Sequence, residues 1–322
     1  MVSKHLKLLF LTILFGSFSV LAFAQEEEKK TEEEPELPPA EVVTVKTEDG
    51  VSLKCEWYPG TNGKLTIPVI LIHDWGNDRR GMLPLAARLQ AKHGYAVLVP
   101  DLRGHGQSVK HVNMDEPLDH TEFKKAQIAS VVNDIEACRR FFMEKNNNAE
   151  LNVEMLSLVA SHHSCVHALN WAVMDWSWDT LPDGTKQGQY VKAIVMLSPV
   201  RRFKSMNMSP ALKTPVISGR GMQRPPTIAI FWGSEDATSN REAKALHTTL
   251  AKSRVDPNDF PKEDRWIHQD LFQIPYSTES VGEDLLSDNA SSKLANSVGV
   301  LLQRKMVDQA EDYRWQDHSK KE

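Results

Sequence analysis

The stretch PVILIHDWGNDRRGMLPLAARLQAKHGYAVLVPDLRGHGQS, residues 68–108, decides the fold of this chain. It opens with a continuous apolar run, which is typical of a strand buried on both faces of a sheet. A helical pattern follows and ends at Gly94, and a second apolar run leads into a glycine-rich turn. Strand, helix and strand in this order predict two parallel strands joined by a crossover helix.

The same alternation continues on both sides of this stretch. Alternating apolar and polar residues around Asp49-Gly50 predict an antiparallel hairpin at the start of the folded part. Further strands are expected at 153–161, 191–199, 226–236 and 270–276. Helical periodicity predicts helices at 124–145, from near 163 onward, at 240–253 and at 291–306. The sequence therefore predicts a single α/β domain over residues 42–308, with about eight mostly parallel strands and helices on both faces.

The segments outside this domain have their own character. Residues 1–24 begin with two lysines, continue with an apolar run and end in Ala-Phe-Ala, a pattern that predicts a cleavable secretory signal peptide. An uncleaved membrane anchor is the alternative interpretation. Residues 25–41 are predicted to be an acidic, disordered linker, and 309–322 a polar tail. We therefore expect a secreted or periplasmic protein with no membrane anchor after cleavage.

Charge and cysteine content exclude several classes of function. Residues 26–41 hold eight glutamates and two lysines, a net charge of −6, whereas the whole chain has −5, so the folded part is close to neutral. No nucleic-acid partner is expected from such a domain. The three cysteines are widely spaced and lie within apolar patterns, which favours buried free thiols over a disulfide framework.

The residues that end the predicted parallel strands are the candidates for function, because ligands of such sheets bind beyond the carboxyl ends of the strands. Four strand ends carry polar side chains: HDWG from 73, DLRGHGQS from 101, ASHHS from 160 and GSED from 233. At this point the chain resembles the α/β-hydrolase superfamily, particularly its small secreted esterases, lipases and aminopeptidase-like members. The resemblance covers residues 42–308, and its most specific part is the stretch quoted above. Only residues 200–225 stand where a large cap domain often occurs, so no large cap and an open site are expected.

The resemblance implies a catalytic triad, whose positions must be examined one at a time. In the nucleophile motif G-x-S-x-G, Ala160 falls on the first glycine, His162 on the serine and Ser164 on the second glycine. Histidine is not a usual covalent nucleophile for acyl transfer. A displaced serine, Ser161 or Ser164, is the alternative, but a shift of one residue in a tight turn redirects the side chain.

The other two triad positions give opposite results: the acid is present and the histidine is absent. Asp236 matches the acid position, although an aspartate there also suits the N-cap of the next helix. Val281 stands where the triad histidine belongs. The histidines that follow Asp236 are predicted to lie elsewhere: His247 in a helix, His268 before the last strand and His318 in the tail.

The oxyanion loop is altered as well. The family has His-Gly where this chain has His73-Asp74, and the resemblance implies oxyanion donors at the backbone N–H groups of Trp75 and His163. A carboxylate at position 74 would oppose a developing negative charge, whereas a side chain turned outward would be harmless.

Three interpretations follow. The first is a pseudo-hydrolase that retains its pocket for a small-molecule ligand of unknown identity. The second is an active hydrolase of esters or amides that uses a His162–Asp236 pair or a displaced serine. The third is a metal site, because His163 and His167 have the i, i+4 spacing of two ligands on one helix face and could be joined by His162, Asp74 and His73. A core role for His167 is favoured over a ligand role, so neither a metal nor a cofactor is predicted.

Overall fold

The structure is a computed structural model that describes residues 37–182, 184, 186–287 and 291–319. The predicted signal peptide and most of the predicted linker lie outside the described residues. Within the described residues, no helix is both long enough and apolar enough to cross a membrane.

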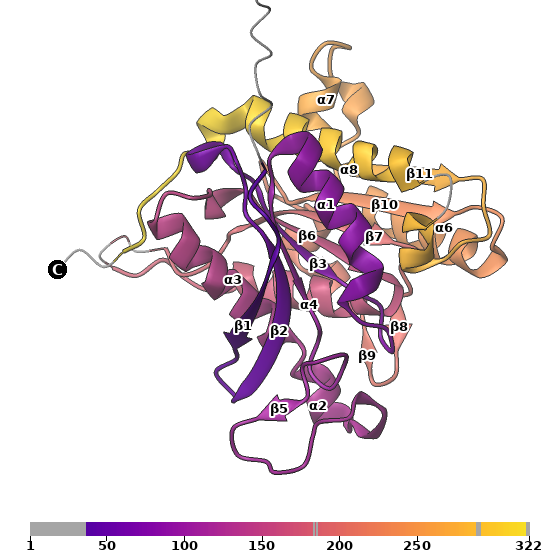
Figure 1. The fold of residues 1–322 in the computed structure, drawn as a ribbon. Helices are drawn as coiled ribbons and strands as arrows, with labels where there is room; N and C mark the ends of the chain where they lie inside the picture. Colours follow the sequence, from indigo (N-terminus) through magenta and orange to yellow (C-terminus); the bar gives the residue numbers. More distant parts are fainter. Residues whose placement is uncertain (1–36, 183, 185, 288–290, 320–322) are drawn as a thin grey trace, which may run out of the picture. The chain divides into compact units, whose positions relative to one another are not determined.

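A nine-stranded sheet forms the centre of the fold (Figure 1). Eight strands follow the order β1-β2-β4-β3-β6-β7-β10-β11, and the short β5 pairs with β2. The strands that pair with β2 are antiparallel to it, and all pairs from β4 to β11 are parallel. The strands are β1 (Glu41–Lys46), β2 (Val51–Tyr58), β3 (Pro68–Ile72), β4 (Ala96–Pro100), β5 (Lys110–His111), β6 (Leu156–Ser161), β7 (Val191–Leu197), β10 (Thr227–Gly233) and β11 (Leu271–Tyr276).

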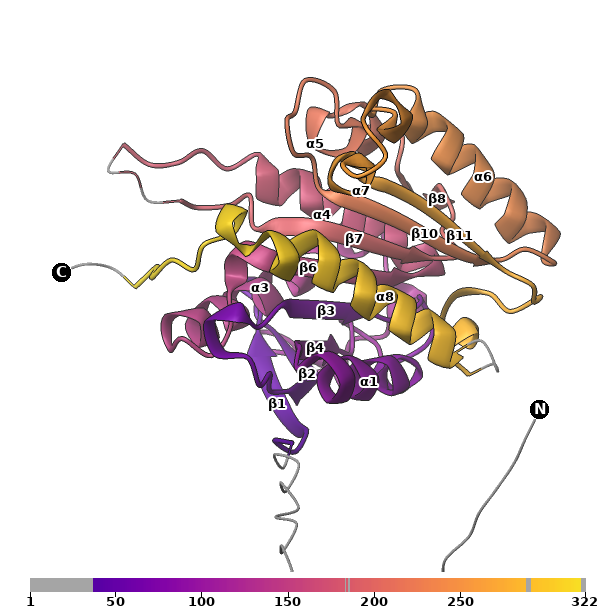
Figure 2. The same ribbon diagram turned by 90° about the horizontal axis from the view of Figure 1, so that it is seen from above.

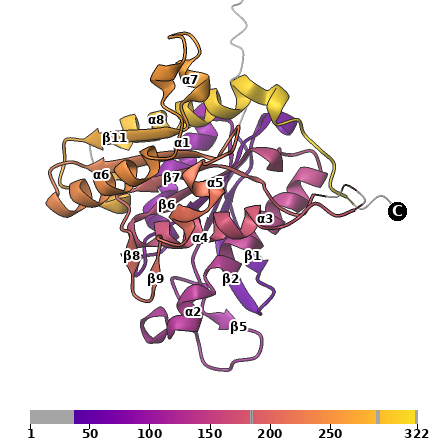
Figure 3. The ribbon, with the colours of Figure 1, turned by 180° about the vertical axis from the view of Figure 1, so that it is seen from behind.

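Helices cover both faces of this sheet. Helices α1 (Leu83–His93) and α8 (Ser291–Met306) pack side by side on one face (Figure 2). The other face carries α3 (Val132–Asn147), α4 (Cys165–Trp176) and α6 (Ala237–Ala251), which are seen from their own side in Figure 3. Since β3, β4, β6 and β7 are buried along their whole lengths or nearly so, their continuous apolar sequences are explained by helices on both sides.

The predicted fold class is confirmed, including the antiparallel hairpin at the start of the domain. The prediction of one helix over 124–145 was wrong, because the chain breaks there into α2 (Lys125–Ala129) and α3. At the break, the Ser130 hydroxyl donates to the Gln127 carbonyl and accepts a hydrogen bond from Arg103. The break in the helical pattern is therefore accompanied by a hydrogen bond from a residue distant in sequence.

Residues 200–225 form small elements rather than a large cap. They contain a short hairpin of β8 (Arg202–Phe203) and β9 (Met206–Asn207), followed by α5 (Pro215–Ser218). The three cysteines, Cys55, Cys138 and Cys165, are buried, and none forms a disulfide.

Candidate functional site

The candidate site lies at the carboxyl ends of β3 and β6, which the sheet register brings together. Ile72, the last residue of β3, pairs with Ala160 in β6, so the residues that follow each strand emerge side by side. These residues are Asp74 and Trp75 from one loop and His162 and His163 from the other. The parallel pairing thus assembles a site from two segments about ninety residues apart in the sequence.

His162 occupies the sharp turn between strand and helix. Its φ of +38° is in the left-handed region, which costs a residue with a side chain about 1–2 kcal/mol. A short 3-10 turn, His162–Ser164, then leads directly into α4. The turn therefore has the strained geometry expected of a nucleophile turn, although the chain has no glycine at 160 or 164 to relieve it.

The two serines beside His162 are not accessible. Ser161 and Ser164 are both fully buried, and among the described residues neither hydroxyl has a hydrogen-bond partner. Because neither side chain is exposed, a substrate at the surface would reach neither hydroxyl.

The Asp74 carboxylate is the centre of the site. Its Oδ1 accepts hydrogen bonds from the backbone N–H groups of Trp75, at 2.8 Å, and His163, at 2.9 Å. The ring nitrogen Nδ1 of His162 lies 3.2 Å from Oδ2, and Nδ1 of His163 lies 3.0 Å from Oδ1 and 3.3 Å from Oδ2. The side chain therefore turns inward, and it brings together two backbone donors and two imidazoles.

These contacts keep Asp74 ionised. Burial by itself would raise the pKa of its carboxyl, because only 17% of the side chain is exposed. The hydrogen bonds from His162 and His163, together with their charges, outweigh burial and hold the pKa well below its usual range. At neutral pH the site thus contains a fixed negative charge.

Two buried histidines hold the Asp74 loop in place. His73 donates from Nδ1 to the Asp74 carbonyl at 2.7 Å and accepts from the Leu102 N–H at Nε2, at 3.0 Å. His105 donates to the Arg103 carbonyl and accepts from the Gly76 N–H. Burial lowers the pKa of both rings, that of His105 to about 3, so they act as neutral connectors.

Aromatic rings form one wall of the site. The Trp75 ring stacks on His167 at a centroid distance of 5.9 Å and contacts Phe203 of the β8–β9 hairpin at 5.1 Å. Phe203 also packs against the His163 ring, at 4.7 Å. The side chains of His162 and His163 nevertheless remain 20% and 33% exposed, so the site is open to solvent.

Asp236 caps a helix in the structure. Its carboxylate accepts a hydrogen bond of 2.6 Å from the Ser239 N–H at the start of α6. Its pKa is lowered chiefly by these bonds from Ser239, with a smaller contribution from the charge of His162. Among the described residues, no hydrogen bond joins Asp236 to His162, whose ring nitrogen is directed at Asp74 instead.

The segment that follows β11 packs against the His162 turn. A Cβ placed on Gly282, which has a φ of +60°, would come within 2.7 Å of the Ser161 hydroxyl and 3.2 Å of the His162 Cβ. The neighbouring Val281 supplies no titratable group. The histidines beyond Asp236 lie elsewhere: His247 in α6, His268 in α7 (Arg265–His268) before β11, and His318 against Glu154.

Sequence reasoning missed Glu283, an acid near the site. It is buried, accepts a hydrogen bond from the Asn77 amide, and has a second oxygen with no hydrogen-bond partner among the described residues. Burial, aided by the charge of Asp74, raises the pKa of Glu283 to about 7. A groove of about 540 Å³ beside it is lined by Gly76, Asn77, Asp78, Arg80, Gly81, Pro84, Glu283, Asp284, Leu286 and Ser287. The signal available in the sequence was the acidic pair Glu283-Asp284, a few residues beyond the last predicted strand.

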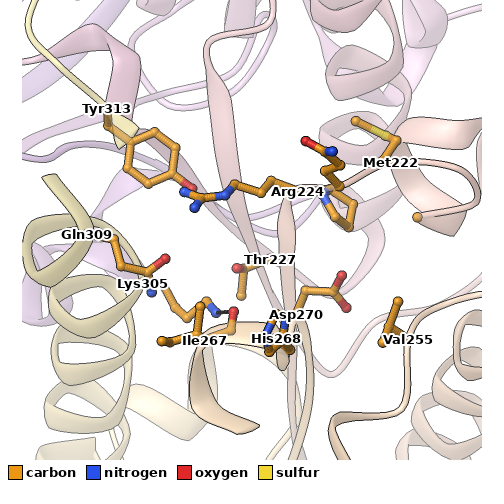
Figure 4. Close-up of a pocket in the computed structure, with 13 residues that line it drawn as sticks. Met222, Arg224, Thr227, Val255, Ile267, His268, Asp270, Lys305, Gln309 and Tyr313 are labelled. Carbon is orange, nitrogen blue, oxygen red and sulfur yellow. Dashed lines mark hydrogen bonds between the residues drawn. The ribbon is translucent and has the colours of Figure 1, made fainter. Parts of the chain in front are cut away.

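A second cavity lies at the opposite end of the strands (Figure 4). Its volume is about 120 Å³, and it is bordered by Thr227 at the start of β10, Asp270 just before β11, and Lys305 of α8. Because ligands of open α/β sheets bind at the carboxyl ends of the strands, this cavity is not the candidate site. His268 also lies here, which places it away from His162 and Asp236.

Comparison with known proteins supports the fold. No protein-family model matches the chain, and no curated protein matches it in sequence. Among solved structures, an esterase of Pyrococcus furiosus superposes with a TM-score of 0.54 at 14% identity, covering 83% of this chain and 93% of the esterase. A dienelactone hydrolase from Anabaena variabilis gives 0.54 at 16% identity, covering 84% of this chain and 100% of that one. A fungal esterase from Rhizomucor miehei gives 0.56 at 12% identity, covering 85% and 86%. The chain therefore has the α/β-hydrolase fold.

Proposed function

We propose that this protein is a pseudo-hydrolase: it retains the strand-end site of an α/β hydrolase for ligand binding and does not carry out serine-hydrolase chemistry. The observation that carries this proposal is the position of the Asp74 carboxylate. Its Oδ1 accepts hydrogen bonds from the backbone N–H groups of Trp75 and His163. These are the two donors that the family resemblance assigns to oxyanion stabilisation.

An occupied oxyanion site argues against acyl transfer in two ways. The tetrahedral intermediate needs two free N–H donors, and each such donor contributes about 10²–10³ in kcat. Here both donors are already bound to an ionised oxygen of the same chain. A substrate oxygen would have to displace this carboxylate and then develop its own negative charge beside it, which is unfavourable in a partly buried site.

The residue in the proposed nucleophile position also supports the proposal. His162 has the backbone geometry of that turn, but its ring is hydrogen-bonded to Asp74, and the flanking serines are buried. The alternative function, hydrolysis through a His162–Asp236 pair, requires the ring to face Asp236. Each member of that pair instead has another partner, Asp74 for the ring and Ser239 for the carboxylate.

Hydrolysis assays test the proposal directly. We expect the purified, chelator-treated protein to show no turnover of ester, thioester or peptide substrates above that of His162→Ala. Hydrolysis that is abolished by His162→Ala would overturn the proposal and favour the histidine-based alternative.

Rebuilding the triad is a more demanding test. In a His162→Ser, Val281→His background, replacing Asp74 by glycine frees the two N–H donors and restores the family's His-Gly. We expect this third substitution to raise ester hydrolysis by about 10²–10³ over the double variant. An equal rate with and without Asp74 would show that the carboxylate does not obstruct the site.

We also propose that the protein is exported. The support is the basic, apolar and small-residue pattern of residues 1–24. Expression of the full chain followed by N-terminal sequencing should give a mature protein that begins at Gln25. A chain that keeps Met1 in the membrane fraction would favour the anchor interpretation.

A further inference from the structure

The geometry points to a metal-binding function for this site: Asp74, His162 and His163 form a three-ligand site for a divalent transition-metal ion of the zinc class. This inference rests on the proposed function, because it names the ligand that the non-catalytic site would hold. Two imidazoles and one carboxylate are a ligand set that such ions accept.

The distances between the donor atoms suit a single ion. Bonds of 2.0–2.1 Å in a tetrahedral site place neighbouring ligand atoms about 3.3 Å apart. Oδ2 of Asp74 lies 3.2 Å from Nδ1 of His162 and 3.3 Å from Nδ1 of His163. One donor atom from each residue can be chosen so that all three lie within 4.8 Å of one another. Binding would therefore require little rearrangement of the site.

The carboxylate is already oriented for this role. The N–H groups of Trp75 and His163 hold Oδ1, while Oδ2 accepts no backbone N–H of the described residues. Oδ2 lies 3.2 Å from Nδ1 of His162 and 3.3 Å from Nδ1 of His163, whose ring is also 3.0 Å from Oδ1. Outer contacts that fix a ligand in this way are typical of metal sites and contribute to affinity. The strained turn at His162 fixes the second ligand through the backbone.

The other histidines weighed in the sequence, His167 and His73, do not belong to the cluster of Asp74, His162 and His163. His167 donates from Nε2 to the Ile128 carbonyl, at 3.0 Å, and is fully buried beneath Trp75. Both ring nitrogens of His73 are engaged with backbone groups. The i, i+4 pair of His163 and His167 is therefore not the basis of the site. Adjacent residues, His162 and His163, supply the two imidazoles instead.

Three protein ligands leave at least one coordination position open. The partial exposure of Asp74, His162 and His163 allows an ion to enter from solvent and a water or small ligand to complete its shell. This arrangement matches metal sites that keep an open position and differs from closed structural sites with four protein ligands.

Metal titration of the mature chain, made without a histidine tag and treated with chelator, tests the inference. We expect one equivalent of Co²⁺ to bind with the visible absorption of a four-coordinate ion, and Zn²⁺ to displace it. His163→Gln and Asp74→Asn should each weaken binding at least about tenfold, since even outer-contact losses cost 10–100-fold. His247→Gln, which removes a histidine on α6, is the matched control and should bind as the wild type does. Circular dichroism of each variant checks that it is folded.

Two results would overturn the inference. The first is the absence of saturable Co²⁺ or Zn²⁺ binding to the folded wild type, which would make the cluster a hydrogen-bonded ion network only. The second is equal affinity in His163→Gln, Asp74→Asn and His247→Gln, which would place the metal elsewhere. Neither result bears on the hydrolysis assays above, which use metal-free protein, so failure of the metal site and failure of the pseudo-hydrolase proposal are distinguishable.

Discussion

Two loops follow neighbouring parallel strands, 73–76 after β3 and 101–108 after β4, and each contains an aspartate at its start. In the second loop, Asp101 accepts from the Arg79 and Gln107 N–H groups, and Arg103 pairs with the buried Asp134. These groups are buried and hydrogen-bonded to the chain itself. In the first loop, Asp74 is also fully engaged, but its partners include two imidazoles that remain partly exposed.

The difference separates the scaffold of the fold from its site. The 101–108 loop keeps the family-like D-x-R-G-x-G-x-S pattern. Its hydrogen bonds stabilise the strand ends, and among the described residues none of them involves the side chains of Asp74, His162 or His163. The 73–76 loop departs from the pattern at Asp74 without disturbing the sheet. The hydrolase fold therefore persists in a chain whose 73–76 loop departs from the family pattern.

The largest effect expected compares Asp134, the buried partner of Arg103 in the 101–108 loop, with Asp74 of the 73–76 loop. Asp134→Asn should lower the free energy of unfolding by about 3 kcal/mol, because it removes the fully buried carboxylate that pairs with Arg103 and leaves only the partly exposed Asp49 as its carboxylate partner. Asp74→Asn should cost about 1 kcal/mol, because the amide oxygen can still accept the two N–H groups. Urea denaturation measures both, and Glu48→Gln, in an exposed ion pair with Arg140, is the control at below about 1 kcal/mol. Equal costs at 134 and 74 would remove the distinction between scaffold and site.

The second prediction concerns pH and the histidine beneath Trp75. Burial lowers the pKa of His167 to about 4, so between pH 6.5 and 4 the unfolded chain binds a proton that the folded chain does not. This contribution to stability is complete above pH 6.5 and is lost as the pH falls toward 4. His167→Gln, which keeps a donor for the Ile128 carbonyl, should therefore lose about 2 kcal/mol less than the wild type between pH 6.5 and 4.5. Urea denaturation of both proteins at pH 6.5 and pH 4.5 measures the two losses. Equal losses of stability in the wild type and His167→Gln would contradict this prediction.

The third prediction concerns the contact between Gly282 and the His162 turn. Gly282→Ala combines a left-handed backbone with close approach to the Ser161 hydroxyl. Gly221 has a similar φ of +73° but no atom within 4 Å of an added Cβ, so Gly221→Ala measures the backbone cost alone. We expect thermal or urea unfolding to show at least about 1 kcal/mol more destabilisation at 282 than at 221. Equal costs would mean that the segment after β11 does not press on the turn.

The smallest effect expected is at Asp236, the N-cap of α6. Asp236→Ala should cost about 1 kcal/mol, as is typical for the loss of an N-cap, whereas Asp236→Asn should be close to neutral because asparagine also caps. Neither variant should alter the binding of Co²⁺ by the site. If Asp236 instead worked with His162 in hydrolysis, both variants would abolish turnover regardless of stability.

Most of the fold could be predicted because its signals are local. Continuous apolar runs marked β3, β4 and β6, and a left-handed glycine, Gly94, ends α1 where the sequence predicted. The break between α2 and α3 was not visible in the periodicity; in the structure Ser130, at the break, accepts a hydrogen bond from Arg103 of a distant loop.

The sequence proposed more candidate site residues than the structure joins by hydrogen bonds: Asp236, expected to work with His162, instead caps α6. The strand-end rule identified Asp74, His162 and His163, since parallel strands deliver their last residues to one edge. Whether the Asp74 carboxylate lies at the Trp75 and His163 N–H groups or points away from them depends on the direction of its side chain. That direction depends on how the two loops meet in space. Glu283 was missed for the same reason, because its burial arises from packing against the Asn77 loop.

The position of Asp74 affects how well dissolved ligands can compete for the two backbone N–H donors. Ester hydrolysis releases a carboxylate, and under the proposed function Asp74 places such a group, covalently tethered, at the two backbone donors. Correct orientation gives a tethered group an effective concentration far above that of any dissolved competitor. The Asp74 carboxylate thus takes the place that the acid product of ester hydrolysis would occupy. Acids, esters and serine-directed covalent probes should therefore compete poorly for the two N–H donors. A ligand that binds well must interact with the Asp74 carboxylate more favourably than these two donors do.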